Sequence, residues 1–310
     1  MELAQQEQTT TWRATWLAQA HAHPYTSIGL GVACAVVVWL LIASIWRVAT
    51  DEADAALRLG LLGGLAGFAA TAIGALPALL LRSLSNRTED TMLGLAAGMM
   101  LAASSFSLIL PGLAAGEHIT GNAALGALTV VAGLGLGVLL MLGLDQFTPH
   151  EHAHLGPCGA GCARVSRVWL FVFAIALHNL PEGMAIGVSF SQGDLSVGLP
   201  LTTAIAIQDI PEGLAVAMAL KAAGLSPLRA VQVAILSGLM EPVGALLGIG
   251  LASGLVLAYP IGLGLAAGAM IFVVSHEVIP ETHRNGHQTP ATIGLMTGFA
   301  VMMVLDTTLG

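Results

Sequence analysis

Long apolar segments dominate this sequence and constrain its fold more than any other feature. Nine segments of mainly apolar residues are long enough to cross the bilayer core as helices. They cover approximately residues 28–46, 57–81, 91–111, 121–144, 168–190, 196–220, 229–253, 255–275 and 291–309. Only 9% of the 310 residues are charged, whereas soluble domains carry roughly 25%. The sequence therefore predicts an all-α integral membrane protein and excludes a soluble one.

The chain divides into three predicted parts. Residues 1–27 are a polar N-terminal segment, residues 28–48 hold the first span, and residues 57–310 hold the other eight. The first span is too long, and its polar leader too extended, for a signal peptide, so we expect it to remain as a transmembrane helix. The longest internal loop, 146–167, contains HEHAH and two cysteines. This loop is either a metal-capturing segment or a polar linker.

The basic residues predict the orientation of the chain. If the N-terminus is cytoplasmic, eight of the ten Lys and Arg residues lie in cytoplasmic segments and only Arg47 and Arg58 lie outside. Cytoplasmic loops of membrane proteins carry such an excess. We therefore expect a cytoplasmic N-terminus, a cytoplasmic 146–167 loop and a C-terminus on the outside.

Polar residues gather near the middle of three spans. Two spans carry matching motifs, HNLPEG at 178–183 and QDIPEG at 208–213, and a third carries Glu241 before Pro242. A charged side chain at the bilayer centre costs about 3 kcal/mol or more, so these carboxylates indicate a functional site. Proline removes a backbone hydrogen bond, and we expect Pro242 to free the carbonyl of Gly238. Interrupted helices at one depth predict a polar cavity between them.

The residues of this predicted cavity offer one imidazole, two amides and four carboxylates. They are His178, Asn179, Glu182, Gln208, Asp209, Glu212 and Glu241. Nitrogen and oxygen donors without a thiolate suit a borderline divalent ion such as Zn²⁺, with Cd²⁺, Fe²⁺ and Mn²⁺ left open. Four carboxylates balance two such ions, which fits a two-metal site bridged by Glu182 and Glu212. The alternative is that these polar residues only clamp the helices together.

Further polar residues lie toward the two ends of the spans. The entrance candidates on the predicted outer side are Met100, Ser107 and Asp306. The exit candidates on the cytoplasmic side are Asp90, Asp145, His150, His152, His154, His276 and Glu277. Taken singly, each of them also fits a packed or solvated residue. Because adjacent residues point to different faces of an α-helix, His276 and Glu277 need not act together.

The two PEG motifs and Glu241 resemble those of the ZIP (Zrt/Irt-like protein) family of divalent-metal transporters. The resemblance covers about 57–310 and implies the eight-helix core of that family, with the helix at 28–48 as an addition. It implies that a zinc-type metal enters the cytoplasm of a bacterium through a binuclear site at the midplane of the cytoplasmic (inner) membrane.

The resemblance also implies a division of the ligands into two neighbouring sites. The first site takes His178, Glu182, Gln208 and Glu212, and the second takes Asn179, Asp209 and Glu241 while sharing Glu182 and Glu212. Gln208 stands where many members of the family have histidine. That difference weakens or broadens the expected selectivity of the first site.

Two other functions use the same residues. An intramembrane metallohydrolase keeps an open coordination position for water, but the sequence has no nucleophile elbow. A metal/proton exporter uses the same site in the opposite direction. We expect a transporter and not an enzyme, with the divalent metal as substrate and no catalytic cofactor. The expected partners are this metal and the lipid bilayer, with no nucleic acid and a possible homodimer.

Overall fold

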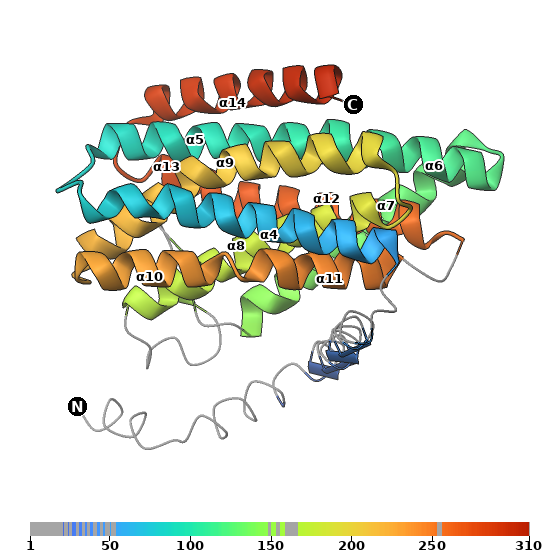
Figure 1. Cartoon of the computed structure of the whole chain (residues 1–310), viewed down its shortest axis with the longest axis horizontal. Helices are drawn as coiled ribbons and strands as arrows, with labels where there is room; N and C mark the ends of the chain where they lie inside the picture. Colours follow the sequence, from blue (N-terminus) through green and yellow to red (C-terminus); the bar gives the residue numbers. More distant parts are fainter. Residues whose placement is uncertain are drawn as a thin grey trace.

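The computed structural model describes residues 54–147, 150–152, 156–158, 167–252 and 256–309, together with single positions between 21 and 50. The predicted segment 1–27, most of the predicted additional helix 28–48, and His154 lie outside the described residues. Within the described ranges the chain is helical, apart from turns and one pair of short strands. The long helices lie side by side along the long axis of the molecule (Figure 1).

The helices between residues 54 and 309 form eight rods in the described part of the chain. In chain order they are α4 (Ala55–Ala75) with the 3-10 turn η2 (Leu76–Leu79), α5 (Asn86–Ala102) with the π-helix η3 (Ala103–Ile109) and α6 (Leu110–Thr120), α7 (Ala123–Phe147), α8 (Arg167–Phe190), α9 (Leu195–Ala222), α10 (Pro227–Ser237) with α11 (Met240–Ala252), α12 (Ala258–Val273) with the π-helix η5 (Val274–Val278) and α13 (Ile279–Thr282), and α14 (Gln288–Leu309).

Among the residues searched, seven of these rods are long and apolar enough to cross a membrane, as judged by length and composition; they are the rods of α4, α5 with α6, α7, α9, α10 with α11, α12 with α13, and α14. Helix α8 contains the span predicted at 168–190. The all-α membrane class is therefore confirmed. The additional helix at 28–48 stays a prediction.

Side-chain caps set where several helices begin. Asp54 Oδ1 accepts a hydrogen bond from the Leu57 N–H at 2.9 Å at the start of α4. Ser85 Oγ accepts one from the Thr88 N–H at 3.1 Å at the start of α5. These bonds satisfy backbone donors of the first turn that no helical carbonyl reaches. The helices thus begin at polar residues that directly precede the apolar spans.

Glycines spaced four residues apart bring three pairs of helices into backbone contact. They are Gly94 and Gly98 against Gly294 and Gly298 (α5 with α14), Gly133 and Gly137 against Gly264 and Gly268 (α7 with α12), and Gly183 and Gly187 against Gly244 and Gly248 (α8 with α11). A Cβ atom at any of these twelve positions would lie 1.9–2.5 Å from a backbone oxygen of the facing helix. Small residues allow this close approach where lipid removes the hydrophobic driving force.

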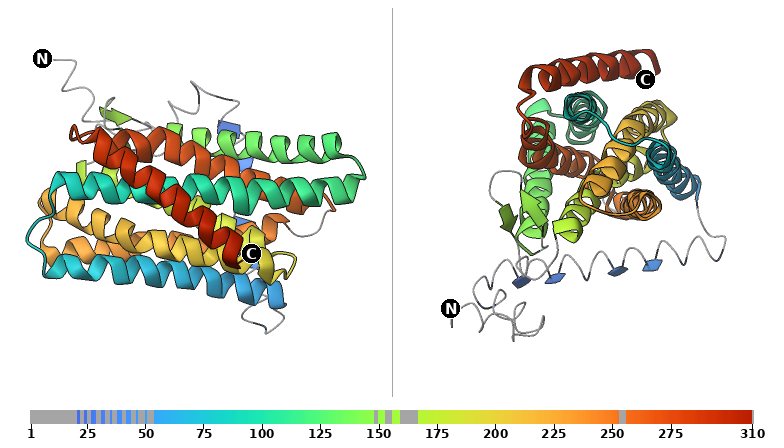
Figure 2. Two further views of the ribbon diagram at one scale, coloured as in Figure 1. Left: turned by 90° about the horizontal axis from the view of Figure 1, so that it is seen from above. Right: turned by 90° about the vertical axis from the view of Figure 1, so that its left-hand side faces the viewer.

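The helices that carry the polar motifs pack against one another. Helix α8 packs against α11, and α4 packs against α9, α11 and α8. Helix α14 lies on the outside of the bundle against α5 (Figures 1 and 2). The motif-bearing helices α8, α9 and α11 and their neighbour α4 therefore surround one shared region.

The break in front of Glu241 differs from the prediction. Helix α10 ends at Ser237 and α11 begins at Met240. The carbonyl of Gly238 is not free, because it accepts a hydrogen bond from the Glu241 N–H at 3.0 Å. The prediction that Pro242 frees this carbonyl is wrong, since the chain tightens into an i to i+3 bond at the break.

The loop predicted at 146–167 contains a short antiparallel strand pair. Strand β1 (His150–His152) pairs with β2 (Gly156–Cys158), with His150 opposite Cys158. The metal-capturing and linker interpretations of this loop both stay predictions.

The glycine contacts predict a position-dependent effect of one added methyl group on α7. Gly137→Ala places a Cβ 2.1 Å from the Leu265 carbonyl oxygen, whereas no described atom lies within 4 Å of a Cβ at Gly135. Both changes raise helix propensity equally, but overpacking at Gly137 costs about 1–3 kcal/mol. We expect Gly137→Ala to lower the thermal unfolding temperature of the detergent-solubilised protein and Gly135→Ala to leave it unchanged or raise it. Equal shifts would contradict the packing argument.

Candidate metal centre

Three helices bring the motif residues together in the interior of the bundle. HNLPEG lies in α8, QDIPEG lies in α9, and Glu241 lies in the first turn of α11. Five of the predicted ligands are at most 3% exposed, namely Asn179, Glu182, Gln208, Asp209 and Glu241. The other two, His178 and Glu212, are half-buried. The predicted polar region is therefore an interior feature of this fold.

The side chains of α8 and α9 meet at Glu182. Gln208 Nε2 donates a hydrogen bond to Glu182 Oε1 at 2.6 Å. Glu182, Asp209 and Glu212 each present a carboxylate oxygen within 4.8 Å of the other two. Carboxylates this close repel one another in a buried site unless protons or a bound cation neutralise them. The geometry therefore fits a positively charged ligand at the junction of the two motifs.

Glu241 is held from two other helices. Thr71 Oγ1 of α4 donates to Glu241 Oε1 at 2.8 Å, and Asn179 Nδ2 of α8 donates to the same oxygen at 3.5 Å. The other carboxylate oxygen, Oε2, lies beside Gly67 of α4, where an added Cβ would be 1.8 Å from it. The same Cβ would lie 3.2 Å from Asp209 Oδ2. The carboxylates of Glu241 and Asp209 thus meet next to Gly67.

Five buried oxygen atoms of this region have no hydrogen-bond partner among the described residues. They are Asn179 Oδ1, Glu182 Oε2, Gln208 Oε1, Asp209 Oδ2 and Glu241 Oε2. Buried polar atoms in folded proteins are nearly always paired. A cluster of buried acceptors without donors is the arrangement that a bound cation satisfies, and these amide and carboxylate oxygens fit a divalent ion.

Thr71 and Gly67 belong to this region but do not stand out in the sequence. A threonine and a glycine within an apolar span are ordinary residues of transmembrane helices. Their place beside Glu241 follows from the packing of α4 against α9 and α11. The spacing of four residues between them, which puts both on one helix face, is the only sequence signal they share.

Of the three predicted entrance residues, two form a hydrogen bond with each other and the third packs in the hydrophobic core. Ser107 Oγ, in the π-helix η3, donates a hydrogen bond to Asp306 Oδ1 of α14 at 2.5 Å. Met100 is 1% exposed and belongs to the hydrophobic core of the bundle. Ser107 and Asp306 therefore form a polar pair between two helices, while Met100 packs.

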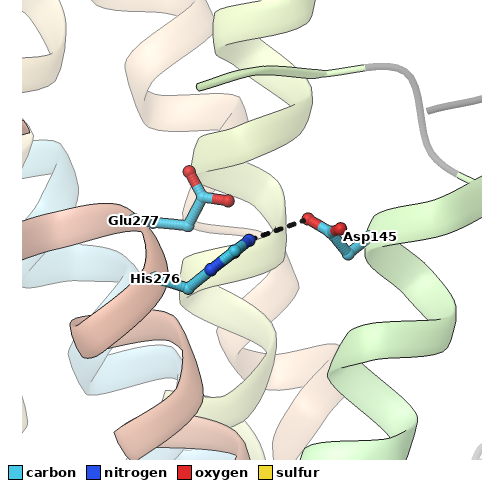
Figure 3. A group of neighbouring side chains, drawn as sticks. All are labelled: Asp145, His276 and Glu277. Atoms are coloured by element: carbon cyan, nitrogen blue, oxygen red, sulfur yellow. Dashed lines mark ion pairs between the residues drawn. The ribbon is translucent and has the colours of Figure 1, made fainter. Parts of the chain in front are cut away.

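Three of the predicted exit residues form a second cluster, drawn in Figure 3. Asp145 of α7 and His276 and Glu277 of η5 each offer a ligand atom within 4.8 Å of the others. His276 Nε2 lies 3.9 Å from Asp145 Oδ1. Residues 274–278 form a π-helix, which includes both His276 and Glu277. The expectation that these two residues need not act together does not hold in this fold, because both present a ligand atom to Asp145.

Asp90 occupies a separate, buried place near the start of α5. Its carboxylate is 1% exposed; Asn285 Nδ2 donates to Oδ1 at 2.9 Å, and His287 Nδ1 lies 2.9 Å from Oδ2. His150 and His152 lie in β1, and His154 lies outside the described residues. Asp90 therefore ties α5 to the segment between α13 and α14.

Comparison with known proteins identifies related chains. The family described as ZIP zinc transporter matches residues 148–306. The chain is 66% identical over 298 residues to zinc transporter ZIPB of Bordetella bronchiseptica, which covers 96% of each chain. It is 45% identical over 256 residues to zinc transporter GufA of Myxococcus xanthus, covering 81% of this chain and 99% of GufA. It is 30% identical over 334 residues to zinc transporter ZIP11 of Homo sapiens, covering 81% of this chain and 97% of ZIP11.

The contacts of Asp90 predict a structural role that a surface ion pair does not share. In Asp90→Asn the side chain keeps its shape, but Asn285 and His287 no longer face a carboxylate. Weakening buried hydrogen bonds to a charged group costs about 1–3 kcal/mol. We expect Asp90→Asn to lower the thermal unfolding temperature of the purified, metal-free protein.

Glu281→Gln is the matched control for this change. Glu281 pairs with Arg284 at 3.2 Å, and their side chains are 35% and 40% exposed, respectively. Exposed pairs of this kind contribute at most about 1 kcal/mol. An equal loss of stability in both variants would show that burial of Asp90 is not the cause.

Proposed function

Because this chain belongs to the ZIP zinc transporter family, we propose that it transports zinc across a membrane through the polar centre between α8, α9 and α11. One observation carries the proposal: five buried oxygen atoms converge there with no hydrogen-bond partner among the described residues. Such a set is costly in a resting fold and useful for binding a cation that arrives and leaves. The names of the similar proteins support zinc as the cation.

We further propose two neighbouring metal positions in this centre. The contact of Gln208 with Glu182 supports the first position, and the meeting of Glu241 with Asp209 supports the second. Glu182 and Glu212 each bring a carboxylate oxygen within 4.8 Å of one of Asp209, so both would be shared by the two positions. Cd²⁺, Fe²⁺ and Mn²⁺ are further candidate substrates; the imidazole suits Fe²⁺, and the carboxylate and amide oxygens suit Mn²⁺.

The route of the metal is also part of the proposal. Zinc enters past Ser107 and Asp306 and leaves toward the cytoplasm past the cluster of Asp145, His276 and Glu277. Asp90 and the histidines of the 150–154 segment extend the exit side. The motif-bearing helices move against the remaining spans, so that the centre opens to each side in turn.

The expected surroundings follow from the charge distribution and the relatives. The chain lies in the cytoplasmic membrane of a bacterium, with its N-terminus inside and its C-terminus outside. A homodimer stays a prediction, which the mass of the detergent-solubilised protein tests.

The metallohydrolase alternative has one apparent sequence signal, because HEHAH at 150–154 fits the spacing HExxH. That motif binds zinc when a helix places both histidines on one face. Here its first three residues form strand β1. The strand geometry and the family membership both favour transport.

Removal of the shared carboxylates tests the proposed transport directly. Glu182→Ala and Glu212→Ala should each abolish zinc uptake into liposomes that contain the purified protein and a zinc-sensitive dye, because both proposed positions lose a ligand. Glu117→Ala removes an exposed carboxylate at the end of α6 and should leave uptake unchanged. Uptake that survives either interior substitution would refute the proposed route.

Gln208→His tests the assignment of the first position. Imidazole is a better ligand for Zn²⁺ than an amide oxygen and a poor ligand for Mn²⁺. We expect the variant to take up zinc with a lower KM and to resist competition by Mn²⁺ more strongly than the natural chain. Unchanged competition profiles would place Gln208 outside the metal-binding set.

A further inference from the structure

We propose that α4 positions the ligands of the second metal position, although it supplies no ligand of its own. Helix α4 (Ala55–Ala75) contains neither a carboxylate nor an imidazole. Two of its residues, Thr71 and Gly67, nevertheless contact the carboxylate of Glu241. Thr71 orients that carboxylate, and Gly67 leaves the space in which it meets Asp209. This inference rests on the proposed transport function.

The hydroxyl of Thr71 is committed to Glu241. A threonine inside a helix commonly bonds to the carbonyl four residues before it. Thr71 instead donates to Glu241 Oε1 at 2.8 Å, and its side chain is 5% exposed. Its methyl side packs at the break between α10 and α11, where a Cβ on Gly238 would lie 3.2 Å from Thr71 Cβ and 3.3 Å from Cγ2. The packing against Gly238 thus restricts the side chain whose hydroxyl donates to Glu241.

The backbone of Thr71 is fixed against α9 as well. A Cβ on Gly213, the glycine of the QDIPEG motif, would lie 2.4 Å from the Thr71 carbonyl oxygen. Gly213 stands four residues after Asp209, on the same face of α9. The close contact therefore sets the distance between Thr71 on α4 and Asp209 on α9. Thr71 therefore contacts Glu241 directly and also contacts the helix that carries Asp209.

Gly67 completes the arrangement one turn earlier on α4. A Cβ at this position would lie 1.8 Å from Glu241 Oε2 and 3.2 Å from Asp209 Oδ2. Both of these oxygens lack a hydrogen-bond partner among the described residues, and their side chains are 0% and 2% exposed. Any larger residue at Gly67 would occupy the place where the two oxygens face each other.

Thr71 and Gly67 lie next to different oxygens of the Glu241 carboxylate. Thr71 occupies Oε1, which leaves Oε2 as the oxygen available to a cation beside Asp209 Oδ2. Groups that orient a metal ligand typically change metal affinity about 10–100-fold when they are removed. In the described part of the chain, no hydrogen bond joins Thr71 to Glu182 or Gln208, around which the first position is built. The effect of Thr71 should therefore fall on one metal position only.

Calorimetric titration of the purified full-length chain with ZnCl₂ tests this inference. The natural chain should bind two zinc ions. Thr71→Val keeps the shape of the side chain and removes its hydroxyl, so it should weaken one of the two binding events about 10–100-fold and leave the other unchanged. Thr71→Ser keeps the hydroxyl, so it should bind both zinc ions as the natural chain does. Gly67→Ala should weaken the same single event as Thr71→Val.

Thr202→Val is the matched control. Thr202 lies in α9, is 8% exposed, and its hydroxyl has no hydrogen-bond partner among the described residues. The same chemical change at this position should leave both binding events and the unfolding temperature unaltered. It therefore measures what the loss of a buried threonine hydroxyl does by itself.

The possible results separate this inference from the proposed function. Two unchanged binding events in Thr71→Val, or equal weakening of both, would overturn the role of Thr71 while zinc transport stands. If Thr71→Val does not fold, Gly67→Ala decides: normal binding by that variant overturns the inference, and selective weakening supports it. A natural chain that binds no zinc would overturn the proposed function and this inference together.

Discussion

The free-energy cost of holding carboxylates inside a helical bundle is the constraint on which the rest of this structure depends. Glu182, Asp209 and Glu241 are at most 2% exposed, in an environment of apolar helices. A buried charge without compensation costs several kcal/mol, so such groups need hydrogen bonds or a counter-charge. The described residues supply donors from Gln208 and Thr71, and these satisfy only part of the acceptor capacity. A fold that leaves the remaining oxygens open is one that gains stability when a cation binds.

Close helix packing is what keeps the open oxygens together. The glycine of each PEG motif lies against the backbone of another site helix: a Cβ on Gly183 would lie 2.1 Å from the carbonyl oxygen of Glu241, and a Cβ on Gly213 would lie 2.4 Å from that of Thr71. Each motif therefore joins a carboxylate to a contact that fixes a neighbouring helix. A larger residue would separate the helices and with them the carboxylates. The glutamate and the glycine of each PEG motif therefore act together: the glycine allows the close helix contact that keeps the carboxylates near one another.

The sequence was sufficient for the parts of the fold that depend on composition and spacing. Apolar length predicted the helical rods, and carboxylates within the spans predicted which residues converge, because a buried charge is conspicuous in an apolar segment. Thr71 and Gly67 are inconspicuous by the same reasoning, since neither is costly to bury. Their role comes from which helix lies beside Glu241, and that is decided by packing over a separation of 170 residues. The bond from Glu241 to Gly238 is a second case, because proline chemistry alone does not specify how a broken helix closes.

At the two ends of the proposed path, the polar residues lie in or beside π-helices, whereas at the centre they lie beside close glycine contacts. Ser107 lies in the π-helix η3 and contacts Asp306, whereas His276 and Glu277 lie in the π-helix η5 and face Asp145. A π-turn carries one more residue than an α-turn, so it changes the direction of the side chains that follow it relative to those before it. Both irregular turns contain residues of a polar contact, with His276 and Glu277 within 4.8 Å of Asp145. Irregular turns thus place polar residues at the ends, while glycine contacts place them at the centre. Both devices are local, and this explains how a mostly apolar bundle can present polar groups at several depths without a continuous polar helix face.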